Sequence, residues 1–401
     1  MLSELRLDLF KCFRALHLPL APFTLLTGPN ASGKSTVIQA LTLLHQTAVD
    51  TSWGANLLLD GSILSLGTLG DVVDKVNGRR GFSIGLTGEG PAGEDFTCLW
   101  TFESSALSAE DVRSADREDI AVPLHDLSLR VGSMELFVDP PGSLLPDHPS
   151  PVRKSLARLI ERITYVSAER MGPRETYPLF DPSRHGTVGP RGERAPGMLH
   201  WYEDDEVLPG LRFEGETAPF LYKQTQAWLA DFFPGASLDV QRVQRANLVT
   251  LGIRTSSDTN HHRPQHVGFG LTHVLPILVA CLHGRKGDLI IVENPEVHLH
   301  PMGQMKMGLF LARVAAAGIQ VLVETHSDHV PNGLRRAVKT ELLAPDQAAL
   351  HFFQARTLAE ARGEAQVISP RLDREGNIDY WPDGFFDQFD KDMGYFAGLG
   401  G

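Results

Sequence analysis

The sequence is poor in the features that define several classes of protein. Its three cysteines, Cys12, Cys98 and Cys281, form no CxxC pair, which excludes a disulfide scaffold and a zinc ribbon and fits a reducing cytoplasm. No window approaches the roughly 18 uncharged apolar residues of a membrane span. The N-terminus carries early charges and no apolar stretch of signal length, so we expect neither secretion nor membrane insertion.

The sequence also has no excess of basic residues. Lys and Arg number 37 against 49 Asp and Glu, a net charge of -12, which argues against a chain-wide basic surface for coating nucleic acid. Contact with DNA or RNA would have to be local or made through a partner. The hydrophobic content of 42% excludes disorder as the main state, and 401 residues are enough for two to three domains. No internal repeat or heptad array is present.

Hydrophobic periodicity predicts alternating strands and helices. Short alternating runs from about 50 to 145 predict an antiparallel β lobe inserted after the first helix, and residues from about 150 to 235 predict a segment of helices and loops. The other expected elements are strands at 5–9, 15–18, 23–26, 163–167, 248–253, 289–293 and 319–324, helices at 37–45, 152–162, 220–233, 274–281 and 302–316, and a long loop at 172–197.

A glycine-rich loop stands between the third strand and the first helix and satisfies G-x-x-x-x-G-K-[ST]. Its backbone N–H groups and the helix N-terminus suit phosphates, Lys34 supplies a charge to the β and γ phosphates, and Ser35 can ligate Mg²⁺. We expect Lys34 to face solvent in the empty protein. The nucleotide-binding residues expected here are Gly28, Pro29, Asn30, Ala31, Ser32, Gly33, Lys34, Ser35 and Thr36.

The apolar strand 289–293 ends in Glu293, which is the expected magnesium ligand together with Ser35. Strand 319–324 is followed by His326, at a strand end where doubly wound sheets bind ligands, and His326 is a candidate γ-phosphate sensor. Upstream, Gly268, Gly270 and Thr272 open another helix and form a second possible phosphate cradle. Since one nucleotide does not need two cradles on one chain, the second is expected to face the nucleotide of another copy.

Together these motifs resemble the ABC-type ATPase heads that include SMC-like proteins and, more closely, the ATPase domains of the overcoming-lysogenization-defect (OLD) family found in prokaryotic defence. The resemblance covers most of residues 1–340 and implies an α/β fold. That fold is a P-loop NTPase of ABC-ATPase type, with a mixed sheet, an antiparallel β lobe, a helical lobe and a small C-terminal α+β tail. The matching segments are Gly28 to Thr36 as Walker A, Gly268 to His273 as a diverged signature motif, Leu289 to Glu293 as Walker B, His298 to Pro301 as the D-loop region and His326 as the switch histidine.

The resemblance implies an ATPase head over residues 1–345 and a small, uncharacterised C-terminal domain over 346–401. It implies the cofactors ATP and Mg²⁺, an ATP-sandwiched homodimer or higher oligomer, and a separate effector such as a nuclease. No acidic Toprim cluster follows residue 340, so nuclease activity is not expected in this chain. The missing heptads exclude the coiled-coil role of SMC proteins.

Asn294 departs from the pattern, because the usual general base at this position is a glutamate and an amide cannot accept a proton. Glu296 is the alternative base, or it supports the D-loop turn through hydrogen bonds. The stretch Tyr165 to Arg174 also looks like a segment of these ATPases that reaches the site, with no role assigned. Two functions therefore remain: an ATPase that drives or gates an effector, and a nucleotide-dependent assembly switch that hardly hydrolyses ATP.

Aromatic residues outside the motifs allow two interpretations each. Phe13 and Arg14 are either contacts on the adenine side, as in related heads, or a core phenylalanine beside a surface arginine. Trp381, Phe385 and Phe386 most simply form the small core of the tail, and the alternative is a docking surface.

Overall fold

The structure, a computed structural model, describes residues 1–76, 80–90, 93–103, 120–138, 142–147, 151–182, 186–256, 258–386 and 388–397. Parts of the predicted β lobe and of the predicted loop at 172–197 lie outside these ranges. The chain forms two compact units. Unit 1 consists of Met1–Ala21, Gly28–Ile163 and His351–Ser369, and unit 2 of Pro22–Thr27, Thr164–Leu350 and Pro370–Gly401.

The order of elements follows the alternation expected from the sequence. The strands are β1 (Leu2–Phe10), β2 (Phe13–Pro19), β3 (Phe23–Thr27), β4 (Asn56–Leu58), β5 (Gly81–Glu89), β6 (Asp95–Glu103), β7 (Ala121–Val131), β8 (Met134–Val138), β9 (Ile163–Val166), β10 (Tyr177–Pro178), β11 (Ser237–Arg242), β12 (Leu248–Arg254), β13 (Leu289–Glu293), β14 (Gln320–Glu324), β15 (Ala348–Phe353) and β16 (Val367–Ile368). The α-helices are α1 (Lys34–Thr51), α2 (Leu69–Val72), α3 (Pro151–Glu161), α4 (Ala195–Trp201), α5 (Leu221–Phe232), α6 (Phe269–His283), α7 (Pro301–Ala316), α8 (His329–Lys339), α9 (Arg356–Arg362) and α10 (Gln388–Phe396).

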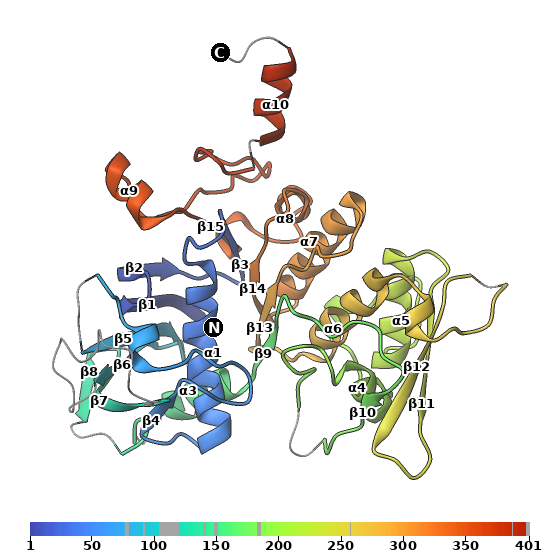
Figure 1. The fold of residues 1–401 in the computed structure, drawn as a ribbon, viewed down its shortest axis with the longest axis horizontal. Coiled ribbons are helices and arrows are strands. Elements are labelled where there is room, and N and C mark those ends of the chain that lie inside the picture. Colours follow the sequence, from blue (N-terminus) through green and yellow to red (C-terminus); the bar gives the residue numbers. More distant parts are fainter. Residues whose placement is uncertain are drawn as a thin grey trace. The chain divides into compact units, whose positions relative to one another are not determined.

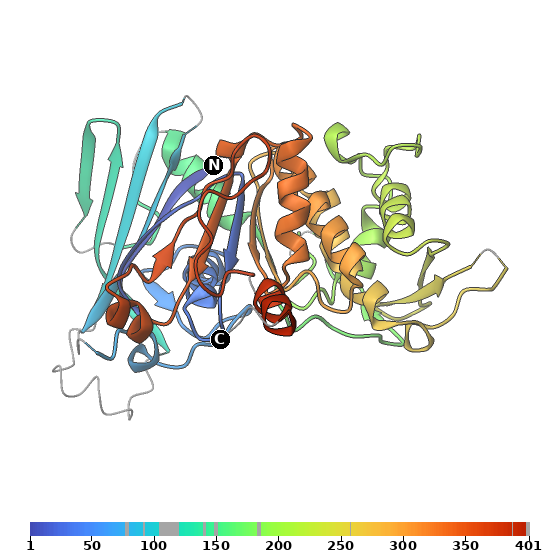
Figure 2. The ribbon, with the colours of Figure 1, turned by 90° about the horizontal axis from the view of Figure 1, so that it is seen from above.

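Unit 1 is built on a seven-stranded sheet in the order β2-β1-β5-β6-β7-β4, with β8 paired to β7. Alternate residues of β5 and β6 are buried, and Phe82 packs its ring on Phe10 and Phe102 at centroid distances of 5.0 and 5.3 Å. Within the described residues the predicted antiparallel β lobe is confirmed, and its strand β5 also pairs with the N-terminal strand β1. Helices α1 and α3 lie against this sheet (Figures 1 and 2).

Unit 2 contains the parallel strands β3, β14 and β13, which are buried on both faces and therefore read as continuous apolar runs. Their register places Leu26 beside Glu324 and Glu324 beside Glu293. The carboxyl ends of the three strands thus lie at one edge of the sheet, where α/β folds bind ligands. A smaller sheet, β10-β12-β11, completes the unit with α4 and α5.

Helices α7 and α8 lie side by side in unit 2 (orange in Figures 1 and 2). A side chain at Gly308 of α7 would overlap the carbonyl of Val330, and one at Gly333 of α8 would overlap the carbonyl of Met305. Glycines at the crossing therefore let the two backbones approach closely. Across the part of the chain that the structure describes, no helix has both the length and the apolar character that spanning a membrane requires.

Candidate functional site

The glycine loop that follows β3 can be formed only with glycine at two of its positions. Gly28 and Gly33 have φ angles of 133° and 109°, in the region that disfavours any residue with a Cβ atom. A Cβ at Gly28 would overlap the carbonyl oxygen of Phe353, and one at Gly33 would lie 2.6 Å from the ring of Phe13 and 2.7 Å from the sulfur of Cys12. The sequence left the role of Phe13 open, and the structure places its ring in the core behind the loop.

Lys34 is the first residue of α1, and its position contradicts the expectation that it faces solvent. Only 3% of Lys34 is exposed, and its Nζ donates to the carbonyl oxygens of Gly28 at 2.9 Å and Pro29 at 2.8 Å. The prediction of a solvent-facing ammonium is therefore wrong, because the long side chain folds back onto acceptors that the tight loop itself presents. The loop residues Pro29, Asn30, Ala31 and Ser35 are exposed, whereas Ser32 and Thr36 are buried.

Glu293 lies at the end of β13 and is held by a segment more than a hundred residues earlier in the chain. Its carboxylate accepts from the backbone N–H of Ala168 at 3.1 Å and is hydrogen-bonded to the side chain of Tyr165. Burial raises the pKa of Glu293, and these hydrogen bonds and the nearby charge of Arg170 oppose that rise. Burial and the Glu293 carboxylate raise the pKa of Tyr165 in turn, so the phenol stays a donor.

Arg170 lies in the segment Tyr165 to Arg174, to which the sequence motifs assigned no role. It is 4% exposed, and its two terminal nitrogens donate to the carbonyl oxygens of Glu293 at 2.7 Å and Asn294 at 2.6 Å. Burial lowers its pKa to about 10, which leaves it charged, and the carboxylates of Glu296 and Glu293 favour that charge. Asn294 has a φ of 44°, a left-handed conformation that asparagine tolerates. The arginine fork thus fixes the turn that leaves β13.

Both carboxylate oxygens of Glu296 accept hydrogen bonds. One accepts from the Thr325 hydroxyl at 2.8 Å and the other from the backbone N–H of His326 at 3.0 Å. This is the arrangement expected if Glu296 supports the D-loop turn, and its role as a base remains a prediction. The side chain of His326 is exposed.

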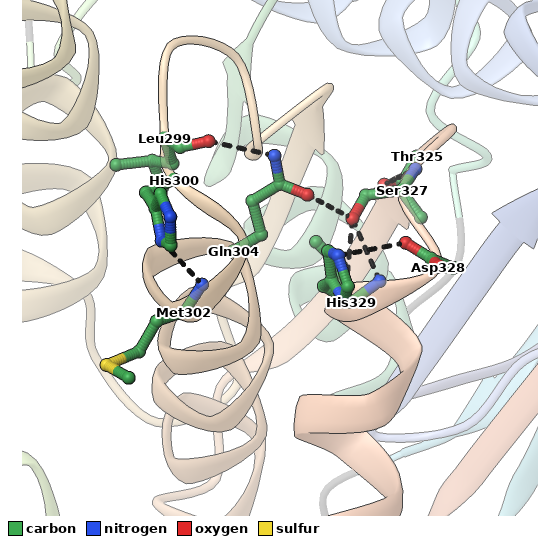
Figure 3. A network of polar contacts seen from close by, with 9 residues as sticks. Leu299, His300, Met302, Gln304, Thr325, Ser327, Asp328 and His329 are labelled. Carbon is green, nitrogen blue, oxygen red and sulfur yellow. Dashed lines mark hydrogen bonds and ion pairs between the residues drawn. The ribbon is translucent and has the colours of Figure 1, made fainter.

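A polar network joins the segment after β13 to the segment after β14 (Figure 3). The Gln304 amide donates to the carbonyl of Leu299 at 2.9 Å and accepts from the Ser327 hydroxyl at 2.6 Å. Ser327 also accepts from the backbone N–H of His329 at 3.0 Å, in the first turn of α8. The D-loop region, the switch-histidine segment and the starts of α7 and α8 therefore form one hydrogen-bonded structure.

The second cradle, at the start of α6, is partly closed by its own chain. A Cβ at Gly270 would lie 2.9 Å from the carbonyl oxygen of His298, and Thr272 is 4% exposed with its hydroxyl 2.9 Å from the carbonyl of Phe269. Gly268 has open space around it, and Phe269 is 54% exposed. Of the three residues predicted to face another copy, Gly268 is exposed, whereas Gly270 and Thr272 are buried.

Behind this cradle, His273 is buried, and its ring lies 4.7 Å from that of His298. Burial and the charges of Arg170 and His298 lower the pKa of His273 to about 4, so it stays neutral at physiological pH. His273 therefore belongs to the packing between α6 and the D-loop. Within the described residues, no group of three or more His, Cys, Asp or Glu side chains could hold a metal ion by itself.

Two protein-family models match the chain. One, described as "AAA domain, putative AbiEii toxin, Type IV TA system", matches residues 23–131 and 189–330, and the other, described as "Protein of unknown function (DUF3696)", matches residues 343–394. The second match begins close to the predicted start of the C-terminal domain. No curated protein matches the chain.

Solved structures of SMC heads are similar to this chain over almost its whole length. An SMC head bound to the C-winged helix domain of ScpA is 11% identical with a TM-score of 0.53, covering 93% of this chain and 98% of that one. A Pyrococcus furiosus SMC head with an extended coiled coil, bound to the C-terminal domain of ScpA, is 10% identical with a TM-score of 0.50, covering 99% of both chains. These likenesses confirm the predicted fold class, that of an ABC-type ATPase head.

Proposed function

Because the chain belongs to the AAA-domain family that matches residues 23–131 and 189–330, we propose that it binds and hydrolyses Mg-ATP through the glycine loop. The observation that carries the proposal is the conformation of that loop. It has two obligatory glycines, Gly28 and Gly33, and leads directly into an 18-residue helix, whose N-terminal dipole favours phosphate. Steady-state phosphate release by the purified chain, with and without DNA, tests the activity.

The residues present fit a magnesium nucleotide. In unit 1 the exposed residue Ser35 carries a hydroxyl, and in unit 2 Glu293 carries a carboxylate that neighbouring donors hold in place; each is an oxygen ligand of the kind Mg²⁺ takes. Lys34 would exchange the carbonyls of Gly28 and Pro29 for phosphate oxygens, which are stronger acceptors. The bound cation would neutralise phosphate charge. His326 would sense the γ-phosphate, and Asn294 or Glu296 would position the attacking water.

We further propose that the chain acts through self-association and a separate partner. The exposed start of α6 supports an ATP-sandwiched dimer in which Gly268 approaches the nucleotide of the other copy. The family description names a "putative AbiEii toxin" of a "Type IV TA system", and the similar SMC heads are bound to domains of ScpA. Both likenesses are consistent with an ATPase head over residues 1–345 that drives or gates an effector. This effector would be a cytoplasmic protein such as a nuclease, acting in defence against phage. Residues 346–401 would form a C-terminal domain.

Gly268→Asp tests the dimer without disturbing the fold. The open space around Gly268 accommodates the new side chain, and its φ of -55° suits any residue, but a carboxylate facing the γ-phosphate of a partner copy repels it. We expect ATP-dependent dimerisation, measured by light scattering, to weaken at least about tenfold, since like charges at an interface cost several kcal/mol. Gly186→Asp, at another open glycine, is the control. Undiminished dimerisation of Gly268→Asp would refute the composite site.

The second candidate function is a slow nucleotide switch that acts by assembly. Asn294 cannot accept a proton, and both carboxylate oxygens of Glu296 are already hydrogen-bonded. Both observations favour slow turnover over rapid hydrolysis.

Three variants separate the two functions in single-turnover assays. Glu296→Gln should retain ATP binding and lose about 10²- to 10⁴-fold in hydrolysis if Glu296 is the base. Asn294→Glu should hydrolyse faster if the native site is tuned to be slow. Glu293→Gln should instead weaken the binding of Mg²⁺, so that hydrolysis requires a higher concentration of the metal. Full activity of Glu296→Gln would eliminate Glu296 as the base and leave it the support of the Thr325–His326 turn.

A further inference from the structure

Helix α8 carries a stripe of polar and basic side chains that the proposed ATPase function does not use. Its inner face is buried, and its outer face presents His329, Asn332, Arg335, Arg336 and Lys339 at helical spacing. The stripe covers the eleven residues from His329 to Lys339, or about 15 Å at a rise of about 1.5 Å per residue. Arg336 and Lys339 are exposed.

This stripe forms one wall of an open cavity of about 520 Å³ within unit 2. The first turn of α7, with Pro301 and Met302, forms a second wall, and residues 375–377 of the C-terminal segment form a third. Arg335 fixes that segment by donating to the carbonyl of Gly376 at 2.7 Å. Figure 2 shows the segment, in red, running beside α8. We call this cavity the basic groove.

The electrostatics of the basic groove favour an anion. Arg335, Arg336 and Lys339 line it, against the single carboxylate of Glu375. The ion pair between Lys339 and Glu375, at 3.9 Å, joins two exposed side chains and contributes little. The positive end of the 16-residue helix α7 also opens at the groove.

An exposed aromatic ring, that of Trp381, lies at the border of the basic groove. Trp381 is 46% exposed although Phe385, its neighbour at 5.3 Å, is fully buried, so only part of the expected tail core is formed. The Arg335 guanidinium lies 5.8 Å from the Trp381 ring centroid, which places this ring beside the basic stripe. Tyr380, the preceding residue, is 54% exposed. Aromatic faces beside a cationic track are how proteins hold unpaired bases.

We propose that the basic groove binds single-stranded nucleic acid, with Arg336 and Lys339 on its phosphates and Trp381 stacking on a base. A stripe of about 15 Å spans about four phosphates at about 3.4 Å per nucleotide of a stacked strand. An acidic peptide would use the cations and leave the aromatic rings unused. The groove includes the first turns of α7 and α8, which the Gln304–Ser327 hydrogen bond joins to the switch-histidine segment (Figure 3).

The test measures fluorescence anisotropy of labelled oligo-dT and oligo-rU, each 20 nucleotides long, on the full chain. Arg336→Glu combined with Lys339→Glu should weaken binding at least about tenfold and lower the salt slope by about 1.4, at about 0.7 per lost single-strand phosphate contact. Trp381→Ala should weaken binding about five- to 150-fold and leave the salt slope unchanged, because stacking is not ionic. The matched control is Lys154→Glu with Arg158→Glu, an equal charge change on exposed positions of α3.

The same assay can overturn the proposal. A control variant that weakens binding as much as the groove variant would show a general charge effect. Displacement of the oligonucleotide by equal charge concentrations of polyglutamate or inorganic polyphosphate would show an unspecific anion site. Duplex DNA binding as tightly as the single strand, or no binding by the wild-type chain, would also contradict the proposal. A preference between oligo-dT and oligo-rU supports it and identifies the natural strand.

Discussion

Replacing Arg170 by methionine should reduce ATP turnover about 10- to 100-fold, the usual cost of removing a residue that orients a metal ligand. The substitution leaves the carbonyls of Glu293 and Asn294 without their donors and removes the cation beside the Glu293 carboxylate. Breaking such a buried charge network also destabilises the fold, so the melting temperature should fall. Turnover measured across a Mg²⁺ titration should shift to higher concentrations of the metal, an effect that loss of stability alone does not produce.

Two further variants test whether the effect depends on the charge and the fork of Arg170. Arg174→Met removes an exposed arginine of the same segment and should leave the Mg²⁺ dependence unchanged. Arg170→Lys keeps the charge but lacks the planar fork that reaches two carbonyls, and it should fall between the wild type and Arg170→Met. Wild-type Mg²⁺ dependence in Arg170→Met would show that the arginine only stabilises the fold.

Lys34→Met should weaken ATP binding at least about tenfold, because a hydrogen bond to a charged group contributes about 1.5–3 kcal/mol. Methionine has a similar length and no charge, so it keeps most of the packing of a side chain that is 3% exposed. It cannot donate to the Gly28 and Pro29 carbonyls, so the loop itself should also loosen. Binding of a fluorescent ATP analogue and thermal unfolding measure the two effects separately.

The control is Lys11→Met, which removes a half-buried lysine bonded to Gln39 of α1. It should change neither the affinity for ATP nor the conformation of the glycine loop. If Lys34→Met bound ATP as tightly as the wild type, the phosphate role of Lys34 would be refuted, whatever happened to its melting temperature.

The local patterns in the sequence were enough to predict the glycine loop, the carboxylate at the end of β13 and the helix after Gly268. Each of these depends on periodicity and turn chemistry within a dozen residues. Gly28 and Gly33 have backbone conformations that disfavour other residues, so the presence of glycine at these positions already indicates those conformations.

The features that the sequence did not predict depend on contacts between distant segments. Arg170 bonds to carbonyls 123 and 124 residues away, and no local pattern specifies such partners. The burial of Gly270 against His298 and the pairing of β5 with β1 are likewise tertiary. The sequence also did not predict that the Lys34 side chain folds back onto its own loop. The motif describes contacts between the lysine and phosphate, and it does not show that the loop carbonyls accept from the lysine when no phosphate is bound.

Calorimetric titration of ATP into the wild-type chain, with Mg²⁺ and with EDTA, tests the central claim most directly. The account predicts one ATP per chain, bound more tightly with Mg²⁺ than with EDTA and much more weakly by Lys34→Met. A chain that binds no ATP with Mg²⁺ present, or binds it equally with and without Lys34, would contradict the assignment of the glycine loop.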